Sequence, residues 1–218
     1  MTPSRKALIE QVLHERTRRI TLVMEDIDKP HNAGAVLRTA DCFGIQDLHL
    51  IETTTAYKHS QGVTRGSTKW LNLYRHRDPK VNNTEACFRF LKERGYRIYV
   101  TSPAAEEEGT QHLDLQHNTA ILFGTEWFGA SDYAKEHADG FVKLPMYGFT
   151  ESFNISVAAA LTMQQLVMRL RQEYTDWGLS EEEIRDLRLE WYRNSVKNPE
   201  IVEKAYWSQQ KESEAGDA

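Results

Sequence analysis

The chain has 218 residues, a length that fits one domain or one domain with short appendages. Apolar residues make up 40% of it, enough for a core, but no apolar run approaches the ~20 residues that a membrane-spanning helix requires. The amino-terminal segment is polar, so we expect no signal peptide. These features argue against a membrane protein, and we expect a protein of the cytoplasm.

The chain has two cysteines, and both lie in segments with a helical pattern. Their spacing is typical neither of a metal site nor of a redox motif. We therefore expect Cys42 and Cys87 to be buried free thiols, which fits a reducing compartment.

The net charge of −5 is unevenly distributed along the chain. Residues 1–75 carry 11 Lys and Arg against 8 Asp and Glu, whereas the remaining residues carry 16 against 24. A charge run is usually only a solvated surface, but RNA binding needs no more than a local basic footprint. If such a footprint exists, we expect it in the amino-terminal half, at Arg16, Arg18, Arg19, Lys58, Arg65 and Lys69.

Helices and strands are predicted in alternation along most of the chain. A helix is expected from Thr2-Pro3 to about Arg16, since proline favours the first helical position. Strands are predicted at 20–24, 47–51, 71–74, 96–101, 119–123 and 141–144. The other predicted helices cover 32–43, about 79–94, 154–174, 180–194 and the segment from 199 to about 209.

This alternation is typical of an α/β fold with a largely parallel sheet. A Rossmann dinucleotide-binding domain is one alternative, but it requires a Gly-x-Gly-x-x-Gly turn after the first strand and an acidic residue about 20 positions later. The glycines of this chain meet neither requirement.

The most informative segment runs from Leu144 to Leu161. It starts at a short apolar strand and passes through a loop of turn formers and small polar residues. It then enters a helix at Asn154, a good N-cap, and the first turns of this helix are rich in Ala and Ser. By itself such a segment is more often an ordinary strand-to-helix connection, but it also suits a ligand site built largely from backbone.

Together with two earlier segments, this segment resembles the signature of the SpoU branch of the SPOUT methyltransferases. The segment from Asn32 to Gly44 resembles motif 1 of these enzymes, and the Gly124-Thr125-Glu126-Trp127-Phe128-Gly129 core of 121–131 resembles motif 2. The segment 144–161 resembles motif 3. The three matches occur in the family's order and extend over about 20–170.

The resemblance implies a fold that no local pattern in the chain predicts, because true knots are rare. It implies an α/β SPOUT domain over 19–175 with a carboxyl-terminal trefoil knot at about 120–170. Helical extensions at 1–18 and 176–218 are similar to those of the tRNA 2′-O-methyltransferases in this family (the TrmH type). A homodimer is also implied, with active sites shared between the subunits.

The implied reaction transfers a methyl group from S-adenosylmethionine to a ribose 2′-hydroxyl of tRNA, most specifically a D-loop guanosine. Arg38 matches the family's catalytic arginine. Because a guanidinium stays protonated, we expect it to bind the phosphate beside the target ribose and to stabilise the developing alkoxide. The resemblance pairs Asn32 of one subunit with Ser152 of the other. We expect Asn154 to stabilise the motif 3 loop and to contact RNA or cofactor, and Glu126 either to orient backbone amides or to contact Arg38.

The cofactor is expected at the carboxyl ends of the strands. The candidates are Thr101 and Ser102 after the fourth predicted strand, Gly124 and Thr125 after the fifth, and Leu144, Met146 and Phe153 in motif 3. Backbone groups there would recognise the adenine edges, and the apolar side chains would line the pocket.

We assign no metal site, because the eight histidines show no ligand spacing. Two further alternatives stay open at this point. The substrate could be ribosomal RNA, or the chain could be a non-catalytic RNA-binding protein of the same fold.

Overall fold

The structure is a computed structural model that describes residues 1–57, 66–103, 105–106, 109–204 and 208. It divides into two compact units. One consists of Met1–His14 together with Leu179–Ala218, and the other of Glu15–Gly178. Within the described residues, no helix combines the length and the apolar character needed to cross a membrane.

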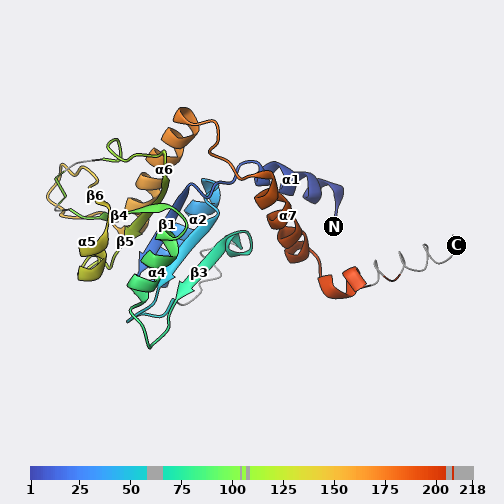
Figure 1. Cartoon of the computed structure of the whole chain (residues 1–218), viewed down its shortest axis with the longest axis horizontal. Coiled ribbons are helices and arrows are strands. Elements are labelled where there is room, and N and C mark those ends of the chain that lie inside the picture. Colours follow the sequence, from blue (N-terminus) through green and yellow to red (C-terminus); the bar gives the residue numbers. More distant parts are fainter. Residues whose placement is uncertain (58–65, 104, 107–108, 205–207, 209–218) are drawn as a thin grey trace. The chain divides into compact units, whose positions relative to one another are not determined.

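The larger unit is built on a six-stranded sheet in the order β3-β2-β1-β5-β4-β6 (Figure 1). Every pairing between these strands is parallel. Their bounds are β1 (Ile20–Glu25), β2 (Asp47–Ile51), β3 (Asn72–His76), β4 (Tyr96–Thr101), β5 (Asn118–Phe123) and β6 (Gly140–Val142). The predicted α/β fold with a parallel sheet is therefore confirmed.

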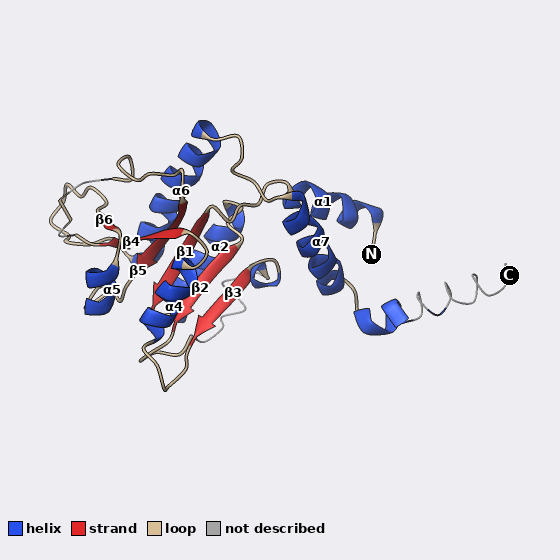
Figure 2. Cartoon of the chain, viewed as in Figure 1, coloured by secondary structure: helices blue, strands red, loops and turns tan. Residues whose placement is uncertain are grey.

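Helices cover both faces of this sheet, which forms the middle layer (Figure 2). Helices α2 (Pro30–Cys42) and α6 (Ile155–Glu173) pack on one face, through a core that includes Leu37 and Met163. Helices α4 (Asn83–Lys92) and α5 (Asp132–His137) pack on the other, and a short 3-10 helix, η1 (Ser67–Lys69), precedes β3. Alternate residues of each strand face opposite layers, so strands that are apolar throughout are buried on both faces.

The smaller unit contains α1 (Pro3–Leu13) and α7 (Glu181–Ser195), and residues 199–204 are also helical. The two longer helices are linked by Glu10, which accepts hydrogen bonds from Arg188 and Tyr192. The Arg188 hydrogen bond, followed by that from Tyr192, lowers the pKa of Glu10. The predicted capping box of α7 is confirmed, since Ser180 and Glu183 each bond the other's backbone N–H.

Most predicted elements are confirmed to within two residues, but the bounds of two helices were wrong. Helix α1 ends at Leu13, three residues before the predicted Arg16. Helix α4 begins at Asn83, not at Pro79, because the Asn82 side chain caps it by accepting from the N–H groups of Thr84 and Glu85. Strand β6 ends at Val142, so Leu144 lies beyond it. The sequence also gave no prediction of α5, whose six residues are too few for a helical period to emerge.

Two side chains lie in environments other than those expected. Cys42, at the end of α2, is exposed, whereas Cys87 is buried as predicted. Arg16 is only 1% exposed; its guanidinium pairs with Asp41 and donates to the Ile45 carbonyl. Arg16 therefore stabilises the fold, and its assignment to an RNA-binding surface was wrong. A buried guanidinium requires such partners, because an unpaired buried charge is strongly destabilising.

We predict that Gly44→Ala destabilises the larger unit more than Gly95→Ala does. Both glycines have a φ of +76°, so either substitution costs about 1–2 kcal/mol for the left-handed conformation. A Cβ on Gly44 would additionally lie 2.2 Å from the Glu15 carbonyl oxygen, whereas one on Gly95 would meet nothing within 4 Å. Urea unfolding of both variants measures the difference, and equal losses of stability would contradict the close approach at Gly44.

Candidate active site

A cavity of about 980 Å³ opens at the carboxyl ends of β4, β5 and β6. In open parallel sheets this edge is where ligands usually bind, next to the point at which the strand order reverses. Its wall includes all seven residues expected to bind a cofactor: Thr101, Ser102, Gly124, Thr125, Leu144, Met146 and Phe153. The structure thus brings together residues that are up to 52 positions apart in the sequence.

The loop after β5 forms one wall of the cavity and is held by its own backbone. The N–H of Thr125 donates to the Gly129 carbonyl at 2.9 Å, and the Gly129 N–H donates back at 3.1 Å. A Cβ on Gly124 would lie 2.2 Å from the backbone of Gly129 and Ala130, so this tight crossing requires glycine at 124. The glycine of the motif 2 core therefore shapes the wall.

The end of the same loop is anchored to the sheet by Glu25, the last residue of β1. Its carboxylate, 3% exposed, accepts from the N–H and the hydroxyl of Ser131, both at 2.8 Å. It also accepts from the Thr84 hydroxyl of α4 at 2.6 Å. Because a buried carboxylate needs such donors, this contact fixes where the loop returns to the core.

A polar cluster of Lys29, Asn32, Glu126 and Asn154 lies beside the cavity. Glu126 accepts from the Lys29 ammonium and from the Asn32 amide, and the Asn154 amide donates to both Glu126 Oε1 and Asn32 Oδ1 at 3.3 Å. The hydrogen bond that Lys29 donates to Glu126 raises the pKa of Lys29. Glu126 therefore contacts Lys29 and Asn32, and within this chain it makes no contact with Arg38 among the described residues.

Asn154 has a second function, because it is the N-cap of α6 as predicted. Its Oδ1 accepts from the Ser156 N–H at 2.9 Å and from the Ser156 hydroxyl at 2.7 Å. One side chain thus begins the motif 3 helix and joins it to motifs 1 and 2. Ser152, two residues earlier, is exposed and lines the cavity.

Arg38 lies apart from the cavity wall. It is exposed on α2, six residues and about 9 Å along the helix axis from Asn32. Among the described residues its guanidinium makes no hydrogen bond or ion pair. The side chain is thus available to contact a molecule outside this chain.

The other basic residues expected to contact RNA have different surroundings. Arg18 pairs with Asp47 at 3.2 Å, and Arg19 donates to the Leu115 carbonyl at 2.7 Å and pairs with Asp176. Lys69 is exposed at the end of η1. Lys58 and Arg65 lie outside the described residues.

Sequence reasoning missed several side chains around the cavity. Trp127 and Phe128, in the loop after β5, line it while remaining largely exposed, and Tyr147 and Phe149 are exposed in the loop before α6. Lys29 also lies on the wall. The sequence did contain a signal for the aromatic residues. They stand in loops of otherwise small and polar residues, and loops rarely expose large aromatic side chains without a partner.

Comparison with known proteins identifies the class. Residues 19–164 match the SpoU rRNA Methylase family, and the chain belongs to this family.

Individual relatives extend the likeness over nearly the whole chain. A tRNA (guanosine(18)-2′-O)-methyltransferase of Borreliella burgdorferi is 42% identical over 93% of this chain and 91% of its own. The enzyme of that name from Thermus thermophilus is 38% identical over 74% of this chain and 81% of its own. The crystal structure of the A. aeolicus TrmH/SpoU tRNA modifying enzyme, 29% identical, superposes with a TM-score of 0.77 over 89% of this chain and 98% of that one.

We predict that substitutions of Asn154 separate its two functions. Asn154→Ala loses the N-cap and should lower the free energy of unfolding by about 1 kcal/mol. Asn154→Asp keeps a good cap but places a second carboxylate against Glu126, so it should also destabilise at neutral pH. Adding Glu126→Gln to Asn154→Asp should restore part of the loss, as measured by urea unfolding in a double-mutant cycle. Full stability of Asn154→Asp alone would show that the two side chains do not meet.

Proposed function

We propose that this protein transfers a methyl group from S-adenosylmethionine to the ribose 2′-hydroxyl of a D-loop guanosine, guanosine 18, in tRNA. The observation that carries the proposal is the identity of 42% over 93% of the chain to an enzyme named for that reaction. The cavity at the strand ends, lined by the matching motif 2 and motif 3 residues, supports it. The reaction is expected in the cytoplasm.

The residues of the cavity fit S-adenosylmethionine, which supplies the methyl group on its sulfonium. Leu144, Met146 and Phe153 offer an apolar surface for an adenine ring, and the strand-end backbone offers hydrogen-bonding groups for its edges. The wall at Gly124 is formed by backbone, because a side chain there would clash with the backbone of Gly129 and Ala130. Neighbouring carboxylates of Glu126 and Glu151 suit the positive charge of the cofactor.

Arg38 is the proposed catalytic residue. Its guanidinium stays protonated, so it acts by binding the phosphate beside the target ribose and by stabilising the alkoxide that forms as the 2′-hydroxyl loses its proton. A phosphate oxygen or a water molecule takes that proton. Ser152 at the cavity wall and the Asn32–Glu126–Asn154 cluster beside it orient the reacting groups.

A homodimer is proposed as the working unit, because one face of α6 carries exposed apolar side chains. Val157, Leu161 and Met168 are all exposed, and their spacing of four and eleven residues places them on one face of the helix. The opposite face of α6 is buried in the core through Met163 and Leu170. Burying the exposed face against a second copy would give a symmetric contact.

The dimer also gives Arg38 its place in the reaction. Because Arg38 lies off the cavity wall of its own chain, we propose that it acts at the cavity of the second subunit. The pairing of Asn32 with the second subunit's Ser152 stays a prediction from the family resemblance, since in this chain Asn32 is bonded to Glu126 and Asn154. The trefoil knot over about 120–170 remains a prediction from the family resemblance.

The substrate is tested by incubating the purified protein with S-adenosylmethionine labelled in the methyl group and either tRNA or ribosomal RNA. We predict labelling of tRNA at the 2′-oxygen of guanosine 18, located by nuclease mapping. A tRNA whose guanosine 18 already carries a 2′-O-methyl group is the control and should accept no label. Labelling of ribosomal RNA alone, or of a base, would contradict the proposal, and no labelling of either RNA would favour the non-catalytic alternative.

We predict that Arg38→Ala lowers the turnover rate by at least about a hundredfold while the affinity for S-adenosylmethionine stays within about twofold, because Arg38 lies off the cavity wall. Turnover assays and calorimetric titration on the same preparation measure the two effects. Arg89→Ala, which removes an exposed arginine from α4, is the matched control and should retain both. Near-normal turnover of Arg38→Ala would remove Arg38 from the mechanism.

Mixing two inactive variants tests whether sites are shared. Arg38→Ala has an intact cavity, whereas Gly124→Ala keeps Arg38 but places a methyl group against the backbone of Gly129 and should close the cofactor site. If Arg38 acts at the other subunit's cavity, each mixed dimer has one complete site and recovers up to about half of the wild-type activity. If no mixture recovers activity although subunit exchange is verified, the shared site is excluded.

A further inference from the structure

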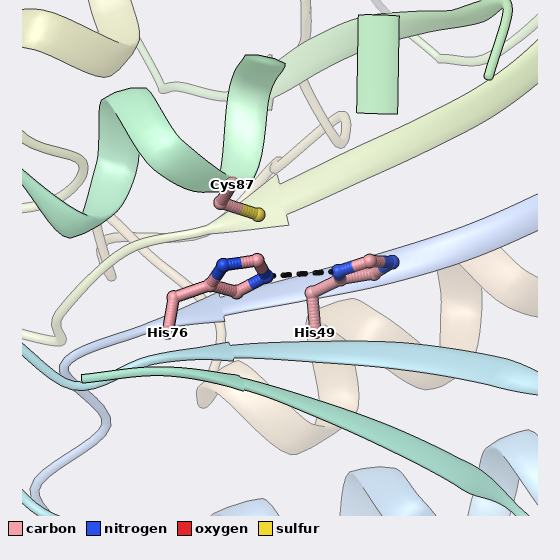
Figure 3. A group of neighbouring side chains, drawn as sticks. All are labelled: His49, His76 and Cys87. Carbon is pink, nitrogen blue, oxygen red and sulfur yellow. Dashed lines mark hydrogen bonds between the residues drawn. The ribbon is translucent and has the colours of Figure 1, made fainter. Parts of the chain in front are cut away.

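A group of three metal-ligating side chains lies away from the cavity, on the sheet face that α4 covers. His49 comes from β2, His76 is the last residue of β3, and Cys87 comes from α4 (Figure 3). His49 and Cys87 are buried, and His76 is partly exposed. Their ligand atoms all lie within 4.8 Å of one another. No part of the proposed methyl transfer uses these residues.

The geometry of the two imidazoles is close to that of a pair of metal ligands. His49 Nδ1 and His76 Nε2 are 3.1 Å apart and face each other between the two strands (Figure 3). Two nitrogen ligands of a tetrahedral zinc ion, each at 2.0–2.1 Å from the metal, are separated by about 3.3 Å. A small outward movement of the two rings would therefore admit an ion between them.

Cys87 completes a set of soft and borderline donors. Among the described residues its thiol makes no hydrogen bond, and it faces the two rings (Figure 3). Two imidazoles and one thiolate are a combination typical of zinc, and three protein ligands leave the fourth position to a water molecule.

Packing orients the ligands of the group. The ring of His49 stacks on Tyr74 at 4.8 Å and meets the edge of Phe90 at 5.3 Å, so its orientation is fixed by packing. The partial exposure of His76 gives an ion access to the group.

We propose that His49, His76 and Cys87 form a zinc site that joins β2, the edge strand β3 and α4. Binding replaces the hydrogen bond between the two imidazoles with two bonds to the metal. The proton of that hydrogen bond moves, by exchange with solvent, to the other nitrogen of its ring, so both imidazoles bind in the neutral form, and the Cys87 thiol releases its proton to solvent as the Zn–S bond forms. The site lies on the opposite face of the sheet from α2 and α6.

The test uses the full-length protein, freed of metal with a chelator, and titrates it with Zn²⁺ by calorimetry. One zinc ion per chain is expected, and Co²⁺ in its place should give the thiolate charge-transfer absorption of a cysteine-bound ion. Cys87→Ala and His76→Gln should each weaken zinc binding by at least about a hundredfold. Loss of a residue that only supports a ligand can already cost about a hundredfold, and loss of a ligand should cost at least as much. Cys87→Ala is a mild change for a buried thiol, because cysteine packs as a small apolar residue.

Cys42→Ala is the matched control, because Cys42 is the other cysteine and is exposed. It should bind zinc like the wild type. If Cys87→Ala fails to fold, as judged by circular dichroism, His76→Gln decides, since His76 is only partly buried. A wild-type protein that binds no zinc, or zinc binding that is unchanged in these two variants, would overturn the proposal and leave the group as a hydrogen-bonded pair beside a buried thiol.

Discussion

The carboxylate of Glu126 is the interaction on which the candidate site depends. It joins Lys29 and Asn32 at the start of α2, the loop after β5, and Asn154 at the start of α6. A partly buried carboxylate needs hydrogen-bond donors, so Glu126 holds these three segments together as long as it is ionised. Since the loop after β5 and the segment before α6 form walls of the cavity, its shape follows from this cluster.

The second constraint is steric and lies in the backbone. The loop after β5 crosses itself so closely at Gly124 that no side chain fits there, and Glu25 anchors its far end through Ser131. A wall formed largely by backbone offers donors and acceptors with little conformational freedom, which favours recognition of a flat polar ring. Helix α6 leaves the site with one buried face and one exposed apolar face, so the same helix completes the core and carries the surface through which we propose that two subunits meet.

Much of the fold could be predicted because it follows from local rules. Apolar strands, the Asn154 cap and the Gly44 stop each depend on neighbouring residues. Arg16 was misassigned because its partner, Asp41, is 25 positions away and no local pattern indicates the pairing. Glu126 and Asn32 meet because they follow the carboxyl ends of β5 and β1, which are neighbours in the sheet. No local pattern shows which strands pair. For the same reason the grouping of His49, His76 and Cys87 has no spacing that a sequence motif would show.

The claim that the strand-end cavity is the cofactor site is tested most directly by a crystal structure of the protein with S-adenosylhomocysteine. The account predicts the adenine against Leu144 and Met146, with its edges bonded to the backbone near Thr101 and Gly124, and an intact Asn32–Glu126–Asn154 cluster beside it. The ligand bound elsewhere on the chain, or in the cavity only after this cluster has come apart, would contradict it.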